Sequence, residues 1–189
     1  MICYNSKTYG SELTFEDYLK LPGLSYSGIK NEGRDNEFIP TQKMKLGTQV
    51  HSYLLTPEVY DHTNKEIVRP MAVELKRTIG QLTNHLKPEI AVTSFFSAQN
   101  FVMPYKGRID LGIPGRLVVD LKVSEMEIDS AIKFFGYDKQ LTGYCKALGC
   151  ALAIIVSINP KTLKTKVTKI THDENWWNYQ IITRGTPLI

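Results

Sequence analysis

Residues 106–122 have the sequence Lys106-Gly-Arg-Ile-Asp110-Leu-Gly-Ile-Pro-Gly-Arg-Leu-Val-Val-Asp120-Leu-Lys122. Apolar and polar side chains alternate on either side of Pro114 and Gly115, as expected for two strands joined by a turn. Pro114 presets φ at the first central turn position, and Gly115 accepts the positive φ that the second position can require. This stretch therefore predicts a β-hairpin. Its second strand has apolar residues at positions 117, 119, 121 and 123, which place that strand in a core.

Three charged side chains are set into this hairpin. Asp110 stands on the first strand, and Asp120 and Lys122 share one face of the second, because strand side chains alternate between faces. Charged groups in a core strand are costly to bury unless they pair with one another or hold a metal ion. One interpretation is a salt-bridged hairpin in which Lys122 neutralises Asp110 or Asp120. The other is a functional site in which the two carboxylates and the lysine act together.

Length and composition predict one globular domain. The chain has 189 residues, of which 42% are hydrophobic and 22% charged, and these are ordinary values for a globular protein. The formal net charge is +4 and the pI is about 8.8, a mildly basic balance that is compatible with a phosphate-bearing partner. We expect a single domain over 1–189, with an N-terminal helical region at 1–60, a sheet core at 90–170 and a C-terminal helix and tail at 171–189.

Cysteine usage and the first residues bear on the cellular location. Cys3, Cys145 and Cys150 form a sparse, odd set without a C-x-x-C pair, which argues against a disulfide framework and against a zinc or iron–sulfur site. The start of the chain lacks the basic and apolar segments of a signal peptide, and no segment is long enough to span a membrane. We therefore expect a cytoplasmic protein without a membrane partner.

Hydrophobic periodicity predicts further helices and strands around the hairpin. Helices are expected where apolar residues recur every three to four positions, and strands where β-branched and aromatic residues cluster. The order of these elements predicts the α/β (α+β) fold class. The expected helices are 14–19, 25–30, 44–55, 72–86, 131–148 and 174–183; the expected strands are 91–97, 151–158 and 163–170, with a short strand at 66–69 in the connector 57–70 and a polar loop at 31–42.

Three polar residues in the predicted helices are further candidates for a site. His51 lies in helix 44–55, and Gln140 and Tyr144 stand four residues apart in helix 131–148, so that these two share one helix face. A lone histidine in a helix is more often structural, and a lone tyrosine is more often a core aromatic. The pairing of Gln140 with Tyr144 favours a functional role, because both would face the hairpin if this helix packs on it.

The order of these motifs resembles that of the PD-(D/E)XK nuclease superfamily, in particular its exonuclease VIII-like branch of phage and prophage recombination nucleases. The resemblance covers most of the chain, from Ser25 to about Gly149. No single motif is specific, whereas their order and spacing together are. The motifs are Ser25-Tyr-Ser-Gly-Ile-Lys30, Leu46-Gly-x-x-Val-His51, Lys106-Gly-Arg-Ile-Asp110, Val119-Asp120-Leu-Lys122 and Tyr137-Asp-x-Gln140-x-x-x-Tyr144.

The resemblance implies a metal site. By similarity, His51, Asp110 and Asp120 would ligate Mg²⁺ or Mn²⁺, and the backbone carbonyl of Leu121 would complete the protein ligands. Hard oxygen ligands suit Mg²⁺, and a neutral imidazole is also an acceptable ligand for a metal such as Mn²⁺. A metal ion held there polarises a phosphodiester and lowers the pKa of a bound water.

The resemblance also assigns roles to the remaining candidates. Lys122 would be the catalytic lysine, which can orient or deprotonate the attacking water and offset developing negative charge. Gln140 and Tyr144 would position the metal, the water or the phosphate of the substrate. Asp110 and Asp120 would contribute to catalysis through the metal.

Fold, substrate and partners follow from the resemblance in the same way. The family fold is a mixed central sheet flanked by helices, in agreement with the order of elements predicted above. The family activity is 5′-to-3′ digestion of linear double-stranded DNA, by a ring-shaped homo-oligomer that works with a single-strand annealing recombinase. We expect these properties here only as the family implies them.

Two departures from the family pattern keep alternatives open. The interval from His51 to Asp110 is 59 residues (110 − 51), which is short for the family, and Glu89 is the nearest candidate for a family glutamate before the first strand. These departures favour a compact nuclease with a changed end preference, and a structure-specific or site-specific endonuclease on the same core is an alternative. A non-catalytic DNA-binding protein is a second alternative, although all the motif residues are present.

Overall fold

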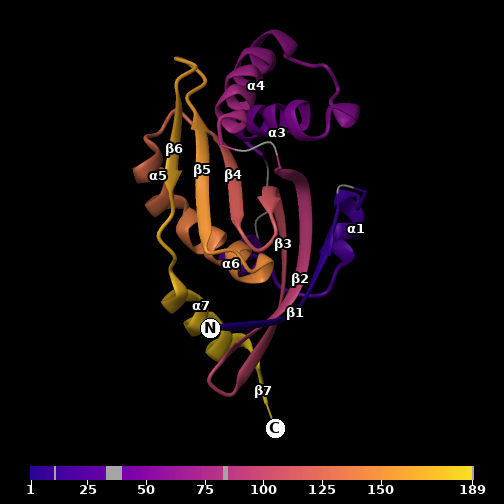
Figure 1. The fold of residues 1–189 in the computed structure, drawn as a ribbon, viewed down its shortest axis with the longest axis vertical. Helices are drawn as coiled ribbons and strands as arrows, with labels where there is room; N and C mark the ends of the chain where they lie inside the picture. Colours follow the sequence, from indigo (N-terminus) through magenta and orange to yellow (C-terminus); the bar gives the residue numbers. More distant parts are fainter. Residues whose placement is uncertain (11, 33–39, 83–84, 189) are drawn as a thin grey trace.

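The structure is a computed structural model that describes residues 1–10, 12–32, 40–82 and 85–188. Its centre is one mixed sheet with helices packed on both faces (Figure 1). Across these described ranges, seven strands pair in the order β1-β2-β3-β4-β5-β6, and β7 pairs with β3. The strands are β1 Ile2–Tyr9, β2 Lys87–Ala98, β3 Phe101–Ile113, β4 Leu117–Val123, β5 Leu152–Ile158, β6 Thr165–Lys169 and β7 Thr186–Pro187.

The parallel pair in this sheet is β4 with β5, whereas the other pairings are antiparallel. Parallel neighbours need a crossover connection, which here consists of α5 Ile128–Phe135 and α6 Tyr137–Leu148. The crossover carries Gln140 and Tyr144 onto the face of the sheet beside β4. The predicted fold class, a mixed central sheet flanked by helices, is confirmed.

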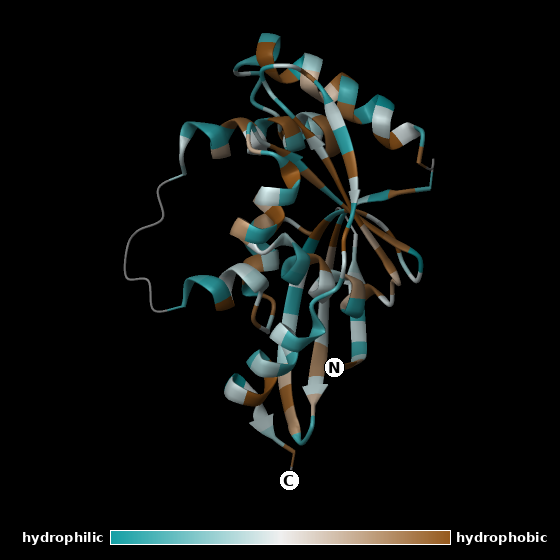
Figure 2. Ribbon diagram, turned by 90° about the vertical axis from the view of Figure 1, so that its left-hand side faces the viewer, coloured by the Kyte–Doolittle hydropathy of each residue, from teal (hydrophilic) through white to brown (hydrophobic). Residues whose placement is uncertain are grey.

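β4 separates two hydrophobic cores. Val118 packs into a core formed with α2, α6 and α7, whereas Val119 and Leu121 pack on the opposite face against α3 and α4. Figure 2 shows hydrophobic residues concentrated along the strands and on the helices that face them. Burial of each such side chain contributes about 1.5–3 kcal/mol, so both faces of β4 are held in place. The remaining helices are α1 Phe15–Lys20, α2 Tyr26–Asn31, α3 Gln42–Leu55, the 3₁₀ helix η1 Pro57–Val59, α4 Lys65–Gly80 and α7 Glu174–Arg184.

The turn of the central hairpin has the predicted form. The N–H of Arg116 donates to the carbonyl of Ile113 at 2.9 Å, which closes a four-residue turn around Pro114 and Gly115. Gly115 has φ +76°, as the second central position of a type II turn requires. The prediction of a tight Pro-Gly reversal is therefore confirmed.

The helix predicted over 131–148 is instead two helices. α5 ends and α6 begins at Gly136, which has φ +71°. The hydroxyl of Tyr26 lies so close to Gly136 that a Cβ there would overlap it. The chain changes direction at Gly136, where α2 packs against the junction of the two helices. The hydrophobic periodicity of residues 131–148 does not reveal this change.

Two predictions in the N-terminal half are wrong. Residues 66–69 are not a strand but belong to α4, whose buried residues Val68, Met71 and Leu75 recur every three to four positions in spite of Pro70. The N-terminal region over residues 1–60 is not wholly helical, since it begins with β1, which pairs with β2 across the edge of the sheet.

The ends of two other predicted segments also differ or fall outside the description. The helix expected at 72–86 ends at Gly80, and residues 83–84 lie outside the described stretches of the chain. Most of the loop expected at 31–42 lies outside the described residues as well. No helix in the described ranges combines the length and the apolar character that crossing a bilayer requires.

Candidate active site

Backbone pairing between the hairpin strands β3 and β4 ends one residue short of Asp110 on β3 and of Asp120 on β4. Backbone pairing runs from Ile113 opposite Leu117 to Leu111 opposite Val119 and does not continue to Asp110. Instead, the Asp110 carboxylate accepts the N–H of Leu121 through Oδ2 at 2.7 Å. A side-chain oxygen thus takes the place that a carbonyl of β3 would fill in a continued ladder.

The carbonyl of Leu121 is satisfied by a second side chain. α3 brings His51 to this edge of β4, with Nε2 at 3.1 Å from the Leu121 carbonyl oxygen. The other ring nitrogen, Nδ1, lies 3.6 Å from Oδ1 of Asp110. The structure therefore brings together three of the predicted metal-binding groups, namely His51, Asp110 and the Leu121 carbonyl, around one residue of β4.

Asp120 and Lys122 form an ion pair on the face of β4 that α6 covers. Lys122 Nζ lies 2.5 Å from Asp120 Oδ2, and only 18% of the lysine side chain and 3% of the aspartate side chain are exposed. The ammonium group also stands 4.7 Å above the centre of the Tyr137 ring, in the geometry of a cation–π contact. The pairing foreseen in the salt-bridge interpretation is thus present, next to the groups gathered around Leu121.

Burial and neighbouring charges set the proton affinities of this pair. Burial raises the pKa of Asp120 to about 6; the Lys122 ammonium opposes this rise, and the Asp110 carboxylate adds to it. Burial alone would lower the pKa of Lys122, but the negative charges of Asp120 and Asp110 raise it above its usual value. Lys122 is therefore held as an ammonium ion beside a carboxylate that is costly to ionise.

Gln140 and Tyr144 are neighbours on α6, as their spacing predicts. Gln140 Nε2 donates to the Tyr144 hydroxyl at 2.9 Å. Burial raises the pKa of Tyr144 well above its usual value, and the charge of Asp120 adds to this effect. Among the described residues, hydrogen bonds link the Gln140 and Tyr144 side chains to each other rather than to Asp110, Asp120 or Lys122. The structure places this pair on the Asp120 side of β4, where the charges of Asp120 and Asp110 act on Tyr144.

Tyr137 is a site residue that lies within one of the sequence motifs but was not predicted to act at the site. It is the first residue of α6, and its ring lies under the Lys122 ammonium. Burial raises the pKa of the Tyr137 hydroxyl, and the Asp120 charge acts in the same direction while Lys122 opposes it. Its position three residues before Gln140 on a short helix was the available signal, because that spacing returns to one helix face.

Glu89 lies across from Asp110 on β2, but it has its own partner. The pairings of Pro88 with Leu111 and of Ile90 with Ile109 place it there, and its carboxylate forms an ion pair with Arg108. Glu89 has φ +50°, a conformation that costs energy for a residue with a Cβ. The candidate family glutamate is therefore next to the site yet engaged with an arginine.

The donor types at this site suit a hard divalent cation, although the described side chains do not form a ready cage. Two carboxylates, one carbonyl and one imidazole are ligands that Mg²⁺ or Mn²⁺ accepts. In the described ranges, no three His, Cys, Asp or Glu side chains lie close enough together to enclose a metal. Asp120 Oδ2 is buried and lies 2.5 Å from the Lys122 ammonium, which compensates its charge. A metal ion bound at this point would compete with the ammonium for this oxygen.

Comparisons with known proteins bear on the fold. No family model and no curated protein matches the sequence. A crystal structure from Eubacterium rectale, named "Putative exonuclease", is 18% identical with a TM-score of 0.56, over 88% of this chain and 71% of that one. A phage related exonuclease from Haemophilus somnus 129PT is 17% identical with a TM-score of 0.42, over 90% of this chain and 88% of that one. The similarity to the Eubacterium rectale protein shows a shared fold.

Proposed function

We propose that this protein is a metal-dependent deoxyribonuclease that hydrolyses phosphodiester bonds of linear double-stranded DNA from an end. The observation that carries the proposal is the environment of Leu121, whose N–H and carbonyl are taken by Asp110 and His51 while Asp120 and Lys122 flank it on β4. The sequence resemblance to exonuclease VIII-like enzymes supports the same activity. So does the fold shared with the Eubacterium rectale structure named "Putative exonuclease".

In this proposal Mg²⁺, or Mn²⁺ in its place, would be held by His51, Asp110, Asp120 and the Leu121 carbonyl. When bound, it would polarise the scissile phosphodiester and lower the pKa of a water ligand. His51 and Asp110 are already oriented toward this point, because Leu121 fixes both side chains. Asp120 would exchange part of its contact with Lys122 for the metal.

Lys122 would act as a cation rather than as a base. The ion pair with Asp120 favours the ammonium form, which can donate hydrogen bonds to the attacking water or to a phosphoryl oxygen. Tyr137 holds the ammonium from below through its ring. The Gln140 amide and the Tyr144 hydroxyl, which now bond to each other, can turn toward the phosphate of a bound strand.

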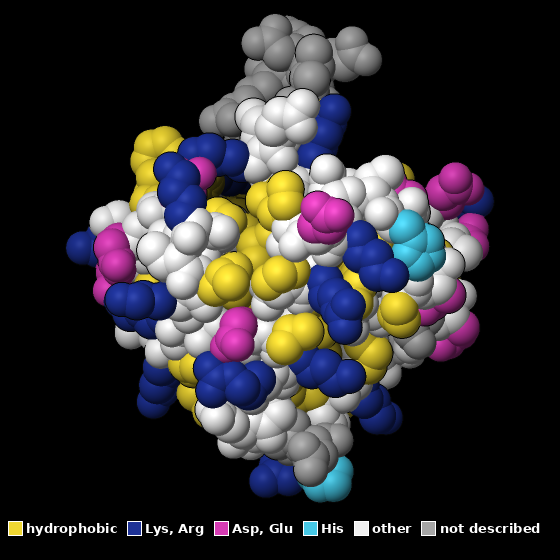
Figure 3. Space-filling model, turned by 90° about the horizontal axis from the view of Figure 1, so that it is seen from above, with side chains coloured by type: hydrophobic (Ala, Val, Ile, Leu, Met, Phe, Trp, Pro, Cys, Tyr) yellow, Lys and Arg dark blue, Asp and Glu magenta, His cyan; other side chains and the backbone are white. Residues whose placement is uncertain are grey.

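The surface near α3 is suited to a polyanion. Figure 3 shows Lys and Arg side chains spread among hydrophobic ones over the face seen from above. A groove of about 520 Å³ between α3 and α4 is lined by Lys65, Arg69 and Lys76 together with Tyr53 and Tyr60. Within the described stretches of the chain, none of these three cations forms an ion pair. They can therefore contact DNA phosphates on the helix pair that also carries His51.

Polarity and partners are proposed from the resemblance. We infer 5′-to-3′ digestion in phage-type recombination, a homo-oligomeric enzyme and cooperation with a single-strand annealing recombinase. Linear duplex DNA labelled at either 5′ or 3′ ends tests the polarity, and sedimentation tests the oligomeric state. Loss of 3′ label before 5′ label would contradict the proposed direction.

The decisive experiment compares linear and covalently closed duplex DNA in Mg²⁺ and in chelator, with wild type, Asp120→Asn and Asp129→Asn. Asp129 is an exposed carboxylate that forms an ion pair with Lys166 and, in the described part of the chain, has no contact with the groups proposed to bind the metal, so this variant is a matched control. We expect Mg²⁺-dependent loss of the linear form by wild type and the control, and no loss by Asp120→Asn.

The other outcomes separate the alternatives. Cleavage of both DNA forms would identify an endonuclease on the same core. Binding of DNA without loss of either form would identify a non-catalytic DNA-binding protein. Cleavage by Asp120→Asn at the wild-type rate would overturn the assignment of this site.

A further inference from the structure

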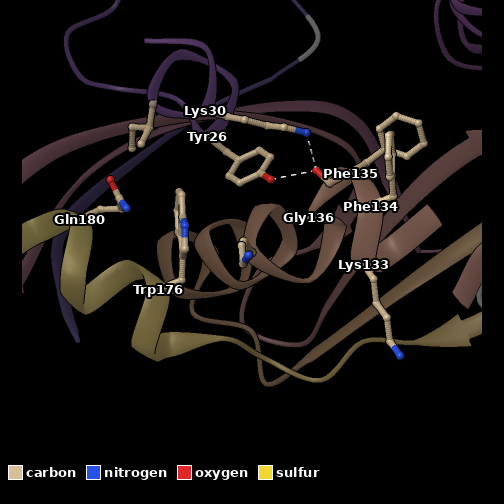
Figure 4. A pocket seen from close by; sticks show the side chains of 10 residues that line it. Tyr26, Lys30, Lys133, Phe134, Phe135, Gly136, Trp176 and Gln180 are labelled. Carbon is tan, nitrogen blue, oxygen red and sulfur yellow. Dashed lines mark hydrogen bonds between the residues drawn. The ribbon is translucent and has the colours of Figure 1, made fainter. Parts of the chain in front are cut away.

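A second concave site lies beside the crossover, separate from the groups around Leu121. It is a pocket of about 310 Å³ between α2, the α5–α6 junction and α7 (Figure 4). This volume is at the lower end of the range for small-ligand sites, about 300–1,000 Å³. No Asp or Glu is found among the described residues that line it. Its lining includes Tyr26, Lys30, Phe134, Phe135, Lys139, Trp176 and Gln180.

Aromatic rings form the walls of this pocket. The rings of Tyr26 and Trp176 lie 5.4 Å apart at 58°, and the Tyr26 hydroxyl donates to the Phe135 carbonyl at 2.9 Å. Trp176 also packs edge-on against the fully buried Trp177 at 5.0 Å, which fixes its position. Phe134 stands at the rim with 73% of the residue exposed, a high value for a phenylalanine. The pocket therefore has rigid walls and, at its rim, an exposed ring that packs edge-on against Phe135 at 4.9 Å and leaves its outer surface open to a ligand.

Gln180 supplies a directed hydrogen-bond donor. It is 7% exposed, and its Oε1 accepts from Arg184 Nε at 2.7 Å. Because an arginine can only donate, the atom facing it must be the amide oxygen, and the NH₂ group points elsewhere. Figure 4 shows the Gln180 amide nitrogen on the side of the pocket. An amide NH₂ fixed in this way can donate to a carbonyl of a ligand.

Lysine side chains give the pocket positive charge. Lys30 Nζ donates to the Phe135 carbonyl at 2.8 Å and lies 6.0 Å from the centre of the Tyr26 ring. Lys139 Nζ lies 6.0 Å from the centre of the Trp176 ring. The cations lie beside the aromatic walls. An anionic ligand with a flat ring could therefore pair its charge with the lysines and stack its ring on the aromatic side chains.

The pocket is connected to the candidate active site through stacked rings. Phe135, whose carbonyl holds Tyr26 and Lys30, stacks on Tyr137 with ring centres 5.4 Å apart. Tyr137 in turn lies under the Lys122 ammonium at 4.7 Å. A strand that passes over Tyr137 can therefore reach the pocket and Lys122 together.

We propose that this pocket binds one unpaired nucleotide of a DNA strand that continues into the active site, an inference that rests on the proposed nuclease function. The base stacks on Phe134 and lies against the Tyr26 and Trp176 rings. The amide of Gln180 donates to a base carbonyl, and Lys139 contacts the backbone phosphate. The substrate class is thus a duplex end with unpaired nucleotides, or single-stranded DNA.

The test measures binding of fluorescein-labelled single-stranded dT12 by anisotropy, in chelator so that no cleavage occurs. The variant Phe134→Ala/Lys139→Gln removes the exposed ring and one cation without opening the core. The control Tyr179→Ala/Lys169→Gln makes the same types of change at exposed positions outside the pocket, since Tyr179 is 64% exposed. We expect the Kd to rise roughly 5- to 150-fold in the pocket variant, the range for losing a stacked base, and to stay at the wild-type value in the control.

A second readout uses tryptophan fluorescence. Trp176 and Trp177 are the two tryptophans of the chain, and Trp177 is fully buried. Quenching on addition of dT12 should therefore come from Trp176 and should disappear in Trp176→Phe, which keeps an aromatic ring in place. Quenching that persists in Trp176→Phe would contradict contact between DNA and the pocket.

The outcomes separate this inference from the proposed function. Equal dT12 affinity in the pocket variant, the control and wild type would overturn the pocket, even if wild type digests linear duplex DNA. Weaker dT12 binding by the pocket variant than by wild type would support the pocket. If wild type also fails to digest DNA, the nuclease proposal would be overturned and the pocket assignment would stand. Equal affinity of wild type for dTMP and dT12, measured by competition, would identify a free-nucleotide site and overturn the strand assignment.

Discussion

The two ends of the β3–β4 hairpin are built on different principles. Near the turn, backbone pairs hold the strands together from Ile113 and Leu117 to Leu111 and Val119. Beyond these pairs the ladder gives way to side chains, and Leu121 receives its partners from Asp110 and His51. The same β4 strand is thus a regular sheet element at one end and a scaffold for polar groups at the other.

This difference shows how a sheet can expose a functional backbone group without leaving it unsatisfied. A buried peptide group without a partner costs about 1–3 kcal/mol, so the ladder cannot simply stop. Here a carboxylate and an imidazole replace the missing strand at Leu121, and these are the side chains that can also bind a metal. At the open end of the hairpin, around Leu121, Asp110 and His51 therefore serve stability and chemistry together. The turn end, from the Leu111–Val119 pair to Pro114 and Gly115, serves stability alone.

The largest expected effect concerns Lys122, which lies beside Leu121 and does not replace a ladder partner. We expect Lys122→Ala to lower the single-turnover rate of DNA cleavage about 10³-fold or more, because it removes a fixed cation from the reacting groups. Metal binding should be largely retained, since the ligands are other residues. Lys122→Met, which keeps the aliphatic stem over Tyr137, should be equally slow.

The control for this prediction is Lys169→Ala, at an exposed position of β6. Its cleavage rate should match that of wild type. Thermal unfolding of each variant shows whether loss of rate reflects loss of structure. Wild-type cleavage by Lys122→Ala would show that the catalytic assignment is wrong.

The next effect concerns the turn end of the hairpin, and it is an effect on stability alone. Leu111 is 6% exposed and packs into the core under α3 and α4, so Leu111→Ala should lower the free energy of unfolding by about 3 kcal/mol. Urea unfolding measures this loss. Below the transition the variant should still cleave DNA, because Asp110 and Leu121 retain their contacts. A loss of cleavage in fully folded Leu111→Ala would mean that the two ends are not independent.

The hairpin could be predicted from sequence because its determinants are local. Strand alternation places Asp120 and Lys122 on one face, and the Pro114-Gly115 pair sets the turn. The salt-bridge interpretation also proved correct in its geometry, since Lys122 pairs with Asp120. What alternation could not predict is that Asp110 would bond the backbone of β4 instead of a side chain.

The elements of the fold that sequence missed depend on partners far away in the chain. The break at Gly136 lies against the Tyr26 hydroxyl of α2, which leaves no room for a Cβ there, and β1 is a strand because β2 pairs with it. α4 extends across Pro70 because buried contacts outweigh the backbone hydrogen bond that proline removes. For the site, the contact of His51 with Leu121 joins residues 70 positions apart, and only the family resemblance pointed to it.

A third prediction separates the two roles of Asp110. Asp110→Asn keeps an oxygen that can accept the Leu121 N–H, whereas Asp110→Ala leaves that N–H unpaired. Urea unfolding in chelator should therefore show a loss of about 1–3 kcal/mol for Asp110→Ala and a smaller loss for Asp110→Asn. Both variants should lose cleavage, because neither carries the negative charge. Equal stability of the two variants would show that the carboxylate is not a substitute for the ladder.

The smallest expected effect is at the turn, where geometry alone is tested. A Cβ on Gly115 would meet no atom within 4 Å, so Gly115→Ala costs only the strain of φ +76°, about 1 kcal/mol, and Gly115→Asn should cost less. The control is Gly47→Ala in α3. Position 47 is equally uncrowded but helical, so this substitution should raise the free energy of unfolding, measured with urea, by about 0.5–1 kcal/mol. Opposite signs for the same substitution, with DNA cleavage unchanged in Gly115→Ala, would confirm that the turn end contributes through its backbone alone. Reduced cleavage in Gly115→Ala would instead show that strain at the turn reaches Leu121, and the contrast between the two ends would fail.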